Sequence, residues 1–276
     1  MPEPAPAAVD EPIPRVLHRV WLGSRPMPAE FERYGESWRR LHPDWEMPLW
    51  TDDHAEELGL EDVLPRARSA GELSDLVRYE VLRRHGGVYV DTDFEALRPL
   101  DPLLTGIGAF TAYARTGNPK IATGVMGSVL GHPAFEAAAD LAHRWLGECP
   151  LGETGPWLMT QVLRDFPDVT VFAAELFYPY HWTELHRRDA EFPDAYAVHH
   201  WSLRFLEKLY HRHAKAAGKV EELEERLARA AADLEEEKRR RKASEARVEG
   251  LERTAWRRLS GTTRRLLHRS ASDRRT

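Results

Sequence analysis

Residues 74–94, SDLVRYEVLRRHGGVYVDTDF, decide the fold of this chain. Ser74 is the expected N-cap of a helix over residues 75–85, and Gly86-Gly87 end that helix. Four apolar residues form its buried stripe: Leu73, Leu76, Val77 and Val81. Residues 88–90 then read as a short apolar strand. A helix that is followed directly by a strand predicts an α/β domain.

The same alternation extends toward the N-terminus. Residues 15–22 read as a strand rich in branched and aromatic side chains, and Gly23 ends it. Residues 30–41 read as a helix, and residues 45–50 read as a second strand. Strands that alternate with helices predict an α/β sandwich with a largely parallel sheet.

A D-x-D motif, Asp91-Thr92-Asp93, follows the strand 88–90. In a strand that continues in extended form, the two aspartates point to one face. Their hard oxygens suit Mg²⁺ or Mn²⁺, but two carboxylates alone make a weak site that water and substrate phosphates must complete. The implied ligand is a metal–diphosphate, as in a nucleotide-sugar. The alternative is a solvated turn, because D-x-D occurs often by chance.

Asp75 and Arg78 lie one helical turn apart in the predicted helix. One interpretation is an exposed ion pair worth a few tenths of a kcal/mol. The other is that both side chains face a substrate, the carboxylate accepting from sugar hydroxyls and the guanidinium pairing with phosphate or a sugar oxygen. The pattern alone does not choose between them.

Four motifs occur in order along the chain. They are Ile13–Gly23 (IPRVLHRVWLG), Ser37-Trp38 with Pro43–Trp45 (SW and PDW), Leu49–Asp52 (LWTD) and Ser74–Asp93. Together they resemble the DXD sugar-binding region of glycosyltransferase family 32, which includes yeast mannosyltransferases and bacterial capsular-polysaccharide-type enzymes. They are more distantly similar to the glucosylating domain of large clostridial toxins. The resemblance covers about residues 13–205.

The resemblance implies a GT-A-like fold, a mixed sheet flanked by helices. It also implies a metal-dependent, retaining hexosyltransferase that uses Mn²⁺ or Mg²⁺. The donor would be a UDP- or GDP-sugar, and the acceptor a hydroxyl of a glycan, a lipid or another molecule.

Site residues follow from the matched motifs only. The resemblance assigns catalysis to Asp75, Arg78, Asp91 and Asp93. It adds Trp21, Leu22, Tyr89, Thr92, His200 and Trp201 as contacts of the nucleotide-sugar, with Trp21 at the base. The metal would be bound directly by Asp93, through water by Asp91, and by His200. Thr154-Gly155-Pro156 resembles a segment near the acceptor side, and the role of His199 beside His200 stays open.

The implied reaction can be stated physically. The metal would neutralise charge that develops on the leaving diphosphate, with further stabilisation from Arg78 and His200. No carboxylate in the matched motifs is an evident nucleophile. We therefore expect attack from the face that the leaving group departs, with the leaving phosphate as the base for the acceptor hydroxyl.

Two other functions fit parts of the pattern. An apolar strand followed by D-x-D also occurs in haloacid-dehalogenase-type phosphatases, but that family places a threonine two residues after the second aspartate, where this chain has Glu95. The second alternative is a non-catalytic coiled-coil scaffold with a degenerate transferase body.

Length and composition exclude several classes of protein. The 276 residues are 42 % apolar, enough for a sizeable core, and a single cysteine, Cys149, excludes an internal disulfide and a cysteine-rich metal site. No apolar run approaches the ~18 residues that span a bilayer. The N-terminus lacks a secretory signal pattern. These features predict a cytoplasmic protein.

Three regions are predicted: a flexible leader over residues 1–12, the glycosyltransferase domain over 13–205 and a helical, partly coiled-coil basic tail over 206–276. Residues 238–276 hold 14 Lys and Arg but only 4 Asp and Glu. Heptads that begin at Val220 are interrupted by polar residues at 237–244, so the tail allows either a homodimer or a single long helix.

The end of the tail combines apolar and basic residues. Trp256 and three leucines lie among arginines, a composition that suits an interfacial helix on an anionic membrane. This predicts a peripheral position at the inner face of the membrane. No groove-reading motif is present, so a nucleic-acid partner is not expected.

Overall fold

The computed structural model describes residues 11–54, 57–150 and 153–201. Its centre is a six-stranded mixed sheet. The strands, in spatial order, are β2 (Leu49–Trp50), β1 (Leu17–Val20), β3 (Gly87–Val90), β6 (Asn118–Ser128), β5 (Ala109–Arg115) and β7 (Thr170–Phe172). A separate two-stranded sheet joins β4 (Phe94–Ala96) and β8 (Ala197–His199).

Five α-helices and four short 3₁₀ helices connect these strands in the described part of the chain. The α-helices are α1 (Ala29–Leu41), α2 (Ala70–His85), α3 (Asp101–Leu104), α4 (Pro133–Trp145) and α5 (Pro156–Val162). The 3₁₀ helices are η1 (Asp52–His54), η2 (Leu64–Arg66), η3 (Ala174–Leu176) and η4 (Trp182–Arg187). The expected α/β architecture of a mixed sheet flanked by helices is confirmed.

One strand of the sheet, β6, runs antiparallel to its neighbours, which the alternation of helices and strands does not predict. β1 is parallel to both β2 and β3, and β5 is parallel to β7. The long strand β6 runs antiparallel to β3 and to β5. β5 and β6 are joined by a tight turn at residues 116–117, a connection that only antiparallel strands allow. Because β6 alone is reversed, the other five strands run in one direction, and the prediction of a largely parallel sheet is confirmed with this one exception.

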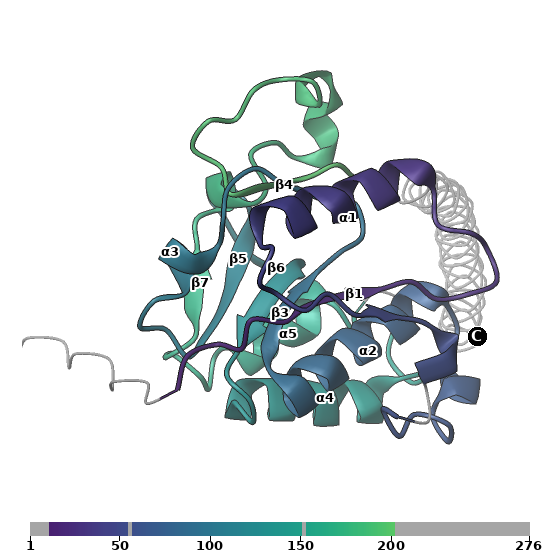
Figure 1. Cartoon of the computed structure of the whole chain (residues 1–276). Coiled ribbons are helices and arrows are strands. Elements are labelled where there is room, and N and C mark those ends of the chain that lie inside the picture. Colours follow the sequence, from purple (N-terminus) through teal and green to yellow (C-terminus); the bar gives the residue numbers. More distant parts are fainter. Residues whose placement is uncertain (1–10, 55–56, 151–152, 202–276) are drawn as a thin grey trace, which may run out of the picture. The chain divides into compact units, whose positions relative to one another are not determined.

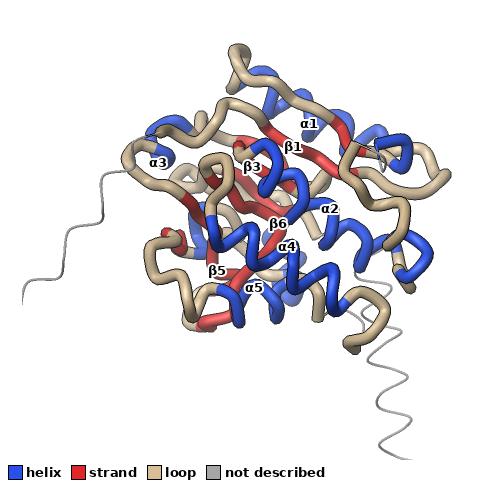
Figure 2. Tube along the Cα trace, turned by 90° about the horizontal axis from the view of Figure 1, so that it is seen from below, coloured by secondary structure: helices blue, strands red, loops and turns tan. Residues whose placement is uncertain are grey.

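Helices cover the sheet on both faces, as Figures 1 and 2 show. On one face α2, α4 and α5 pack over a core that includes Val20 and Tyr89. On the other face α1 and the β4–β8 pair close a second core that includes Leu17, Val88 and Val90. Consecutive strand residues therefore enter opposite cores, as the alternation of side chains in a strand requires.

Helix α2 begins earlier than the sequence pattern predicts. Its N-cap is Ser69, whose hydroxyl accepts a hydrogen bond from the backbone N–H of Glu72 at 3.1 Å. Ser74, the expected N-cap, lies inside the helix, so that prediction is wrong. The C-terminal boundary is confirmed, because Gly86 follows the helix with a positive φ of 62°.

The first two strands are shorter than predicted. β1 spans Leu17–Val20 within the predicted 15–22, and β2 spans only Leu49–Trp50 within the predicted 45–50. Glu46 still bridges to Val16 in parallel, so the predicted segments run side by side.

The described helices contain no segment long and apolar enough to cross a membrane. Residues 206–276, predicted as the tail, lie outside the described residues, as do residues 1–10 of the predicted leader. The predictions of a coiled coil, a dimer and a membrane contact therefore have no described counterpart.

Candidate active site

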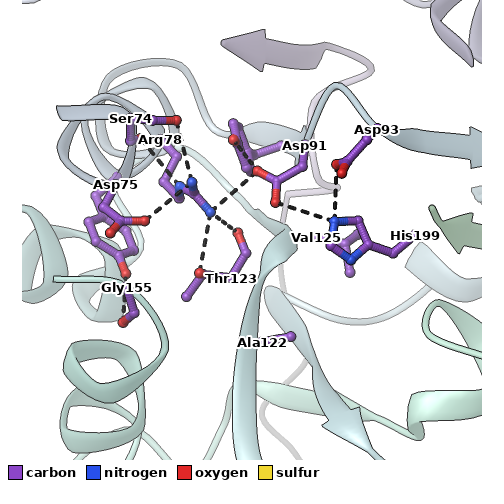
Figure 3. A network of polar contacts seen from close by, with 12 residues as sticks. Ser74, Asp75, Arg78, Asp91, Asp93, Ala122, Thr123, Val125, Gly155 and His199 are labelled. Atoms are coloured by element: carbon purple, nitrogen blue, oxygen red, sulfur yellow. Dashed lines mark hydrogen bonds and ion pairs between the residues drawn. The ribbon is translucent and has the colours of Figure 1, made fainter. Parts of the chain in front are cut away.

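The candidate site lies where β1 and β3 end at one edge of the sheet. Because these two strands are parallel, Trp21 and Asp91, which follow them directly, lie at the same edge. The middle of α2 adds Asp75 and Arg78, and β8 adds His199. Figure 3 shows Arg78 between Asp75 and Asp91, with Asp93 and His199 beside them.

The D-x-D segment is a turn and not a continued strand. β3 ends at Val90, and the backbone N–H of Phe94 donates to the carbonyl of Asp91 at 3.1 Å. The expectation that strand alternation aligns the two aspartates is therefore wrong. The turn nevertheless brings ligand atoms of Asp91, Asp93 and His199 within 4.8 Å of one another.

His199 faces both aspartates. Its Nε2 lies 3.0 Å from Asp93 Oδ1 and 4.0 Å from Asp91 Oδ2. Burial lowers the pKa of His199, but the carboxylates of Asp93 and Asp91 together raise it by more, so the pKa lies above its usual value. The imidazole is therefore held against the carboxylate pair.

Three rings hold His199 in this orientation. Phe94 stacks on it at 4.7 Å between centroids, and the edges of Trp201 and Tyr178 meet it at 4.2 and 5.5 Å. Trp201 has a positive φ of 50°, which is rare for a bulky residue, and its indole N–H donates to the carbonyl of Tyr180 at 3.0 Å. Trp201, predicted to contact the donor, is buried here as a support for His199.

His200 lies on the opposite side of β8 from the carboxylate pair. Its Nε2 is 2.9 Å from Glu95 Oε2, and its ring stacks on Tyr34 at 4.5 Å. The hydrogen bond from His200 lowers the pKa of Glu95. His200 follows the last residue of β8, and its ring is held by Glu95 and Tyr34, whereas the ring of His199 meets Asp93. The structure brings His199 there, and the assignment of His200 to the metal is corrected.

Arg78 is held by four hydrogen bonds and by two carboxylates. Its Nη1 donates to the carbonyl of Thr123 at 2.7 Å and lies 3.4 Å from Asp91 Oδ1. Its Nη2 lies 3.2 Å from Asp75 Oδ1 and 3.4 Å from the Ser74 hydroxyl, and its Nε donates to the Ser74 carbonyl. The hydrogen bonds to Ser74 and Thr123 use four of the five N–H groups of the guanidinium, and the two carboxylates neutralise its charge.

Asp75 and Arg78 form a buried pair, so the interpretation as an exposed ion pair is wrong. Their side chains are 13 % and 9 % exposed. Asp75 Oδ2 also accepts a hydrogen bond from the Thr154 hydroxyl at 2.8 Å. Burial raises the pKa of Asp75, although Arg78 and Thr154 oppose the shift. Thr154-Gly155-Pro156, expected near the acceptor, thus lies directly against Asp75.

Asp91 is fixed at one of its two oxygens. Its Oδ1 accepts a hydrogen bond from the Tyr89 hydroxyl at 2.6 Å and pairs with Arg78. The Arg78 guanidinium lies 4.8 Å above the Tyr89 ring, so a cation–π contact ties these residues together. The other oxygen of Asp91, Oδ2, is the one nearer His199. Tyr89 therefore orients Asp91 from within the core, where it is 1 % exposed.

The remaining predicted residues lie around this centre. Trp21 and Leu22 are half-buried at the end of β1, and the Trp21 ring meets Phe31 edge-on at 5.8 Å. Thr92 is buried in the D-x-D turn. The sequence patterns did not single out Thr123, Tyr178 or Arg19, whose roles depend on contacts between distant segments.

The donor set fits a divalent cation. Two carboxylates and one imidazole converge, and the oxygens suit Mg²⁺ or Mn²⁺. An imidazole is a better ligand for transition ions than for Mg²⁺, so the set favours Mn²⁺ of the two. Asp93, Asp91 and His199 are the residues that would hold it.

Comparison with known proteins agrees with this geometry. Residues 28–107 match a family described as the glycosyltransferase sugar-binding region containing the DXD motif, and Asp91-Thr92-Asp93 is the D-x-D within them. Over this region the chain is similar to DXD glycosyltransferases. The expected family resemblance is confirmed, and the phosphatase alternative is not supported.

Two of the similar curated proteins come from yeasts. The chain is 30 % identical over 221 residues to inositol phosphoceramide mannosyltransferase 3 of Schizosaccharomyces pombe, covering 69 % of this chain and 60 % of that protein. It is 32 % identical over 167 residues to mannosyl phosphorylinositol ceramide synthase SUR1 of Saccharomyces cerevisiae, covering 56 % and 42 %. The chain thus spans about half the length of the curated relatives it matches.

Solved structures with a similar course of the chain are also glycosyltransferases. PaToxG glycosyltransferase aligns with a TM-score of 0.47 and 19 % identity over 57 % of this chain and 71 % of its own. A glycosyltransferase involved in glycosylation of the major capsid of PBCV-1 aligns with a TM-score of 0.44 and 13 % identity, over 72 % and 99 %.

Proposed function

We propose that this chain is a metal-dependent, retaining hexosyltransferase that uses a nucleotide-sugar donor. The observation that carries the proposal is the convergence of Asp91, Asp93 and His199 beside the buried Asp75–Arg78 pair. The first group suits a cation that binds a diphosphate, and the second presents a carboxylate to sugar hydroxyls. The two groups are joined through Asp91, which pairs with Arg78.

Each residue has a role in this proposal. Asp93, His199 and Asp91 would hold the cation, which would supply charge neutralisation to the leaving diphosphate. Asp75 accepts hydrogen bonds from hydroxyls of the transferred sugar. Arg78 orients Asp75 and Asp91 and does not contact the phosphates, because it already pairs with these two carboxylates.

Retention requires either a double displacement through a carboxylate nucleophile or attack from the face that the leaving group departs. Asp75 and Asp91 are both tied to Arg78, and Asp93 is tied to His199, so none of the site carboxylates is a free nucleophile. We therefore favour attack by the acceptor hydroxyl from the face that the leaving group departs, with the leaving phosphate taking the proton. A trapped glycosyl adduct on an Asp or Glu would contradict this mechanism.

The relatives suggest the donor sugar and the acceptor. Two of them are named as enzymes that mannosylate inositol phosphoceramide. We propose a mannosyl donor and a hydroxyl of a membrane lipid headgroup as the acceptor. The basic, apolar end of the tail supports a peripheral position on an anionic membrane, since lipid acceptors lie there.

The experiment is donor turnover across a panel of UDP- and GDP-sugars with Mn²⁺. We expect hydrolysis of one donor, with GDP-mannose as the first candidate, and its loss in chelator. Asp93→Asn removes a carboxylate ligand with little change in shape, and a loss of at least a hundredfold is expected for removal of a group that stabilises developing charge. Asp62→Asn, at an exposed aspartate, is the matched control.

A wild-type chain that binds and turns over no donor would favour the scaffold alternative. Equal turnover by Asp93→Asn and wild type would remove the carboxylate pair from the reaction.

A further inference from the structure

Arg19 is a buried cation in the middle of β1. It is 6 % exposed, and its Nη2 donates to the carbonyl of Phe31 at 2.7 Å and lies 3.4 Å from the carbonyl of Thr92. The same Nη2 lies 3.9 Å from Met27 Sδ. All these contacts are with neutral groups.

No carboxylate of the described residues lies within ion-pair distance of Arg19, although its charge is buried. Glu32 acts on it only from farther away, and Arg39 opposes it with a second positive charge. The pKa of Arg19 is lowered to about 10, chiefly by burial, so the side chain remains charged at neutral pH. Other buried charges of the site are paired, as Arg78 is with Asp75 and Asp91. A buried charge without a counterion is costly, which implies that an anion binds beside it.

The position of Arg19 indicates which anion. Arg19 and Trp21 alternate with Val20 along β1, so they share one face, and both contact Phe31. Arg19 also reaches the carbonyl of Thr92, between the two aspartates of the D-x-D turn. Arg19 thus contacts both Phe31, on which Trp21 packs, and the D-x-D turn, the two places where the resemblance puts the base and the diphosphate of the donor.

The side chain also has room because of a glycine. A Cβ at Gly35 in α1 would overlap Arg19 Nη1, so only glycine lets the guanidinium lie against this turn of the helix. Contact with the Phe31 carbonyl alone would make Arg19 a structural tie between β1 and α1. The experiment below separates the two roles.

We propose that Arg19 binds the diphosphate of the donor nucleotide and is its cationic partner on the protein. This rests on the function proposed above, and it assigns the phosphate contact to Arg19 because Arg78 already pairs with Asp75 and Asp91. A guanidinium forms two parallel hydrogen bonds with phosphate oxygens, so arginine suits this task.

The test is the binding of GDP, UDP, guanosine and uridine to the full-length protein with Mn²⁺, measured by calorimetry. The quantity of interest is the ratio of nucleoside to nucleoside-diphosphate dissociation constants, which isolates the phosphate contribution. We expect Arg19→Gln to lower this ratio about tenfold, the effect of losing a charged hydrogen bond, and to leave nucleoside binding unchanged. Arg164→Gln, at an exposed arginine that follows α5, is the control and should keep the wild-type ratio.

The outcomes are distinguishable. A folded Arg19→Gln with the wild-type ratio and a lowered melting temperature overturns the inference, leaves the proposed function standing and makes Arg19 a structural tie. If Arg19→Gln does not fold, Arg19→Lys decides, because lysine keeps the charge but loses the planar fork: a reduced ratio supports the inference and an unchanged ratio overturns it. Absence of diphosphate binding by the wild-type chain overturns the inference together with the proposed function.

Discussion

Asp91 is the residue on which the two halves of the site depend. Its Oδ1 accepts from Tyr89 and pairs with Arg78, while its Oδ2 lies nearer His199. One oxygen is thus used for orientation and the other is left for a ligand. The carboxylate also packs against β6, where Gly124 leaves it space: a Cβ built there would lie 2.7 Å from Asp91 Oδ2.

Gly124→Ala should therefore impair the site while the fold persists. The added methyl must displace Asp91 or the Tyr178 hydroxyl, which would be 2.9 Å away. We expect at least a tenfold loss of Mn²⁺-dependent donor turnover, because a shift of a few tenths of an ångström matters at a catalytic ligand. Turnover and the Mn²⁺ concentration needed for half-maximal rate are the measurements. Gly71→Ala is the control, since it lies in α2 with no contact closer than 3.8 Å and should raise helix stability.

Unchanged metal dependence in Gly124→Ala would show that Asp91 does not contact the metal.

The sequence identified Asp75, Arg78, Asp91 and Asp93 together because they lie in one short helix–strand segment whose geometry is local. It did not separate His199 from His200, because that choice depends on how β8 pairs with β4. Nor did it predict the hydrogen bonds that Arg78 donates to Thr123, because Thr123 is 45 residues away along the chain.

At the scale of elements, the junction of β1, β2 and α2 is held by a neutral histidine. His18 Nε2 lies 2.9 Å from the carbonyl of Gly86, the residue that ends α2, and its Nδ1 accepts from the Trp50 indole at 3.0 Å. The acceptor role of Nδ1 means that the proton is on Nε2. Burial lowers the pKa of His18 to about 4.

The stability of the domain should therefore fall between pH 6.5 and pH 4. In that range the unfolded chain binds a proton at His18 that the folded chain does not, so acid favours unfolding. The contribution is fully present above pH 6.5, and its loss is complete below the folded pKa of about 4. At pH 5 the loss is about 2 kcal/mol relative to pH 7.5.

Urea unfolding followed by tryptophan fluorescence at pH 7.5 and pH 5 measures this effect. His18→Gln should be less stable at pH 7.5, but its drop on acidification should be smaller than that of the wild type by about 2 kcal/mol. His186→Gln, at an exposed histidine, should keep the wild-type drop. Equal drops in His18→Gln and wild type would mean that His18 is not held neutral.

The elements show where local patterns suffice. The C-terminal end of α2 was predictable because Gly86 adopts a positive φ there. Its beginning was misjudged, although Ser69-x-x-Glu72 carries the S-x-x-E signature of a helix start and Glu72 lies in the first turn. The antiparallel direction of β6 is set by a turn between two strands, which the alternation of helices and strands does not predict.

At the scale of the whole molecule, charge is divided unevenly along the chain. The chain has 39 Lys and Arg and 45 Asp and Glu, yet residues 238–276 hold 14 of the basic residues and 4 of the acidic ones. The candidate site lies in the acidic part of the sequence. A lipid acceptor would lie in a membrane whose surface is negatively charged. That surface would repel the acidic part of the chain on its own.

The basic end should therefore determine membrane binding. Co-sedimentation of the full-length protein with phosphatidylcholine vesicles, with and without phosphatidylserine, measures it. We expect binding only to the anionic vesicles and its loss at high salt. Replacement of Arg257, Arg258, Arg264 and Arg265 by Gln should weaken binding by a factor on the order of a hundred or more, because each basic residue near an anionic surface contributes about 1 kcal/mol.

The control is the same number of neutralised arginines in the described part of the chain, at four exposed positions: Arg33, Arg39, Arg40 and Arg164. It changes the net charge equally and should leave binding near the wild-type level, since these residues lie outside the basic end. Equal losses of vesicle binding in both variants would mean that net charge alone determines binding. The proposal that the tail binds the membrane would then be wrong. Donor hydrolysis by both variants in the absence of vesicles should match the wild type, because the proposed site residues are intact in each. A tail variant with full hydrolysis and weakened transfer to a vesicle-borne acceptor would then separate membrane capture from chemistry.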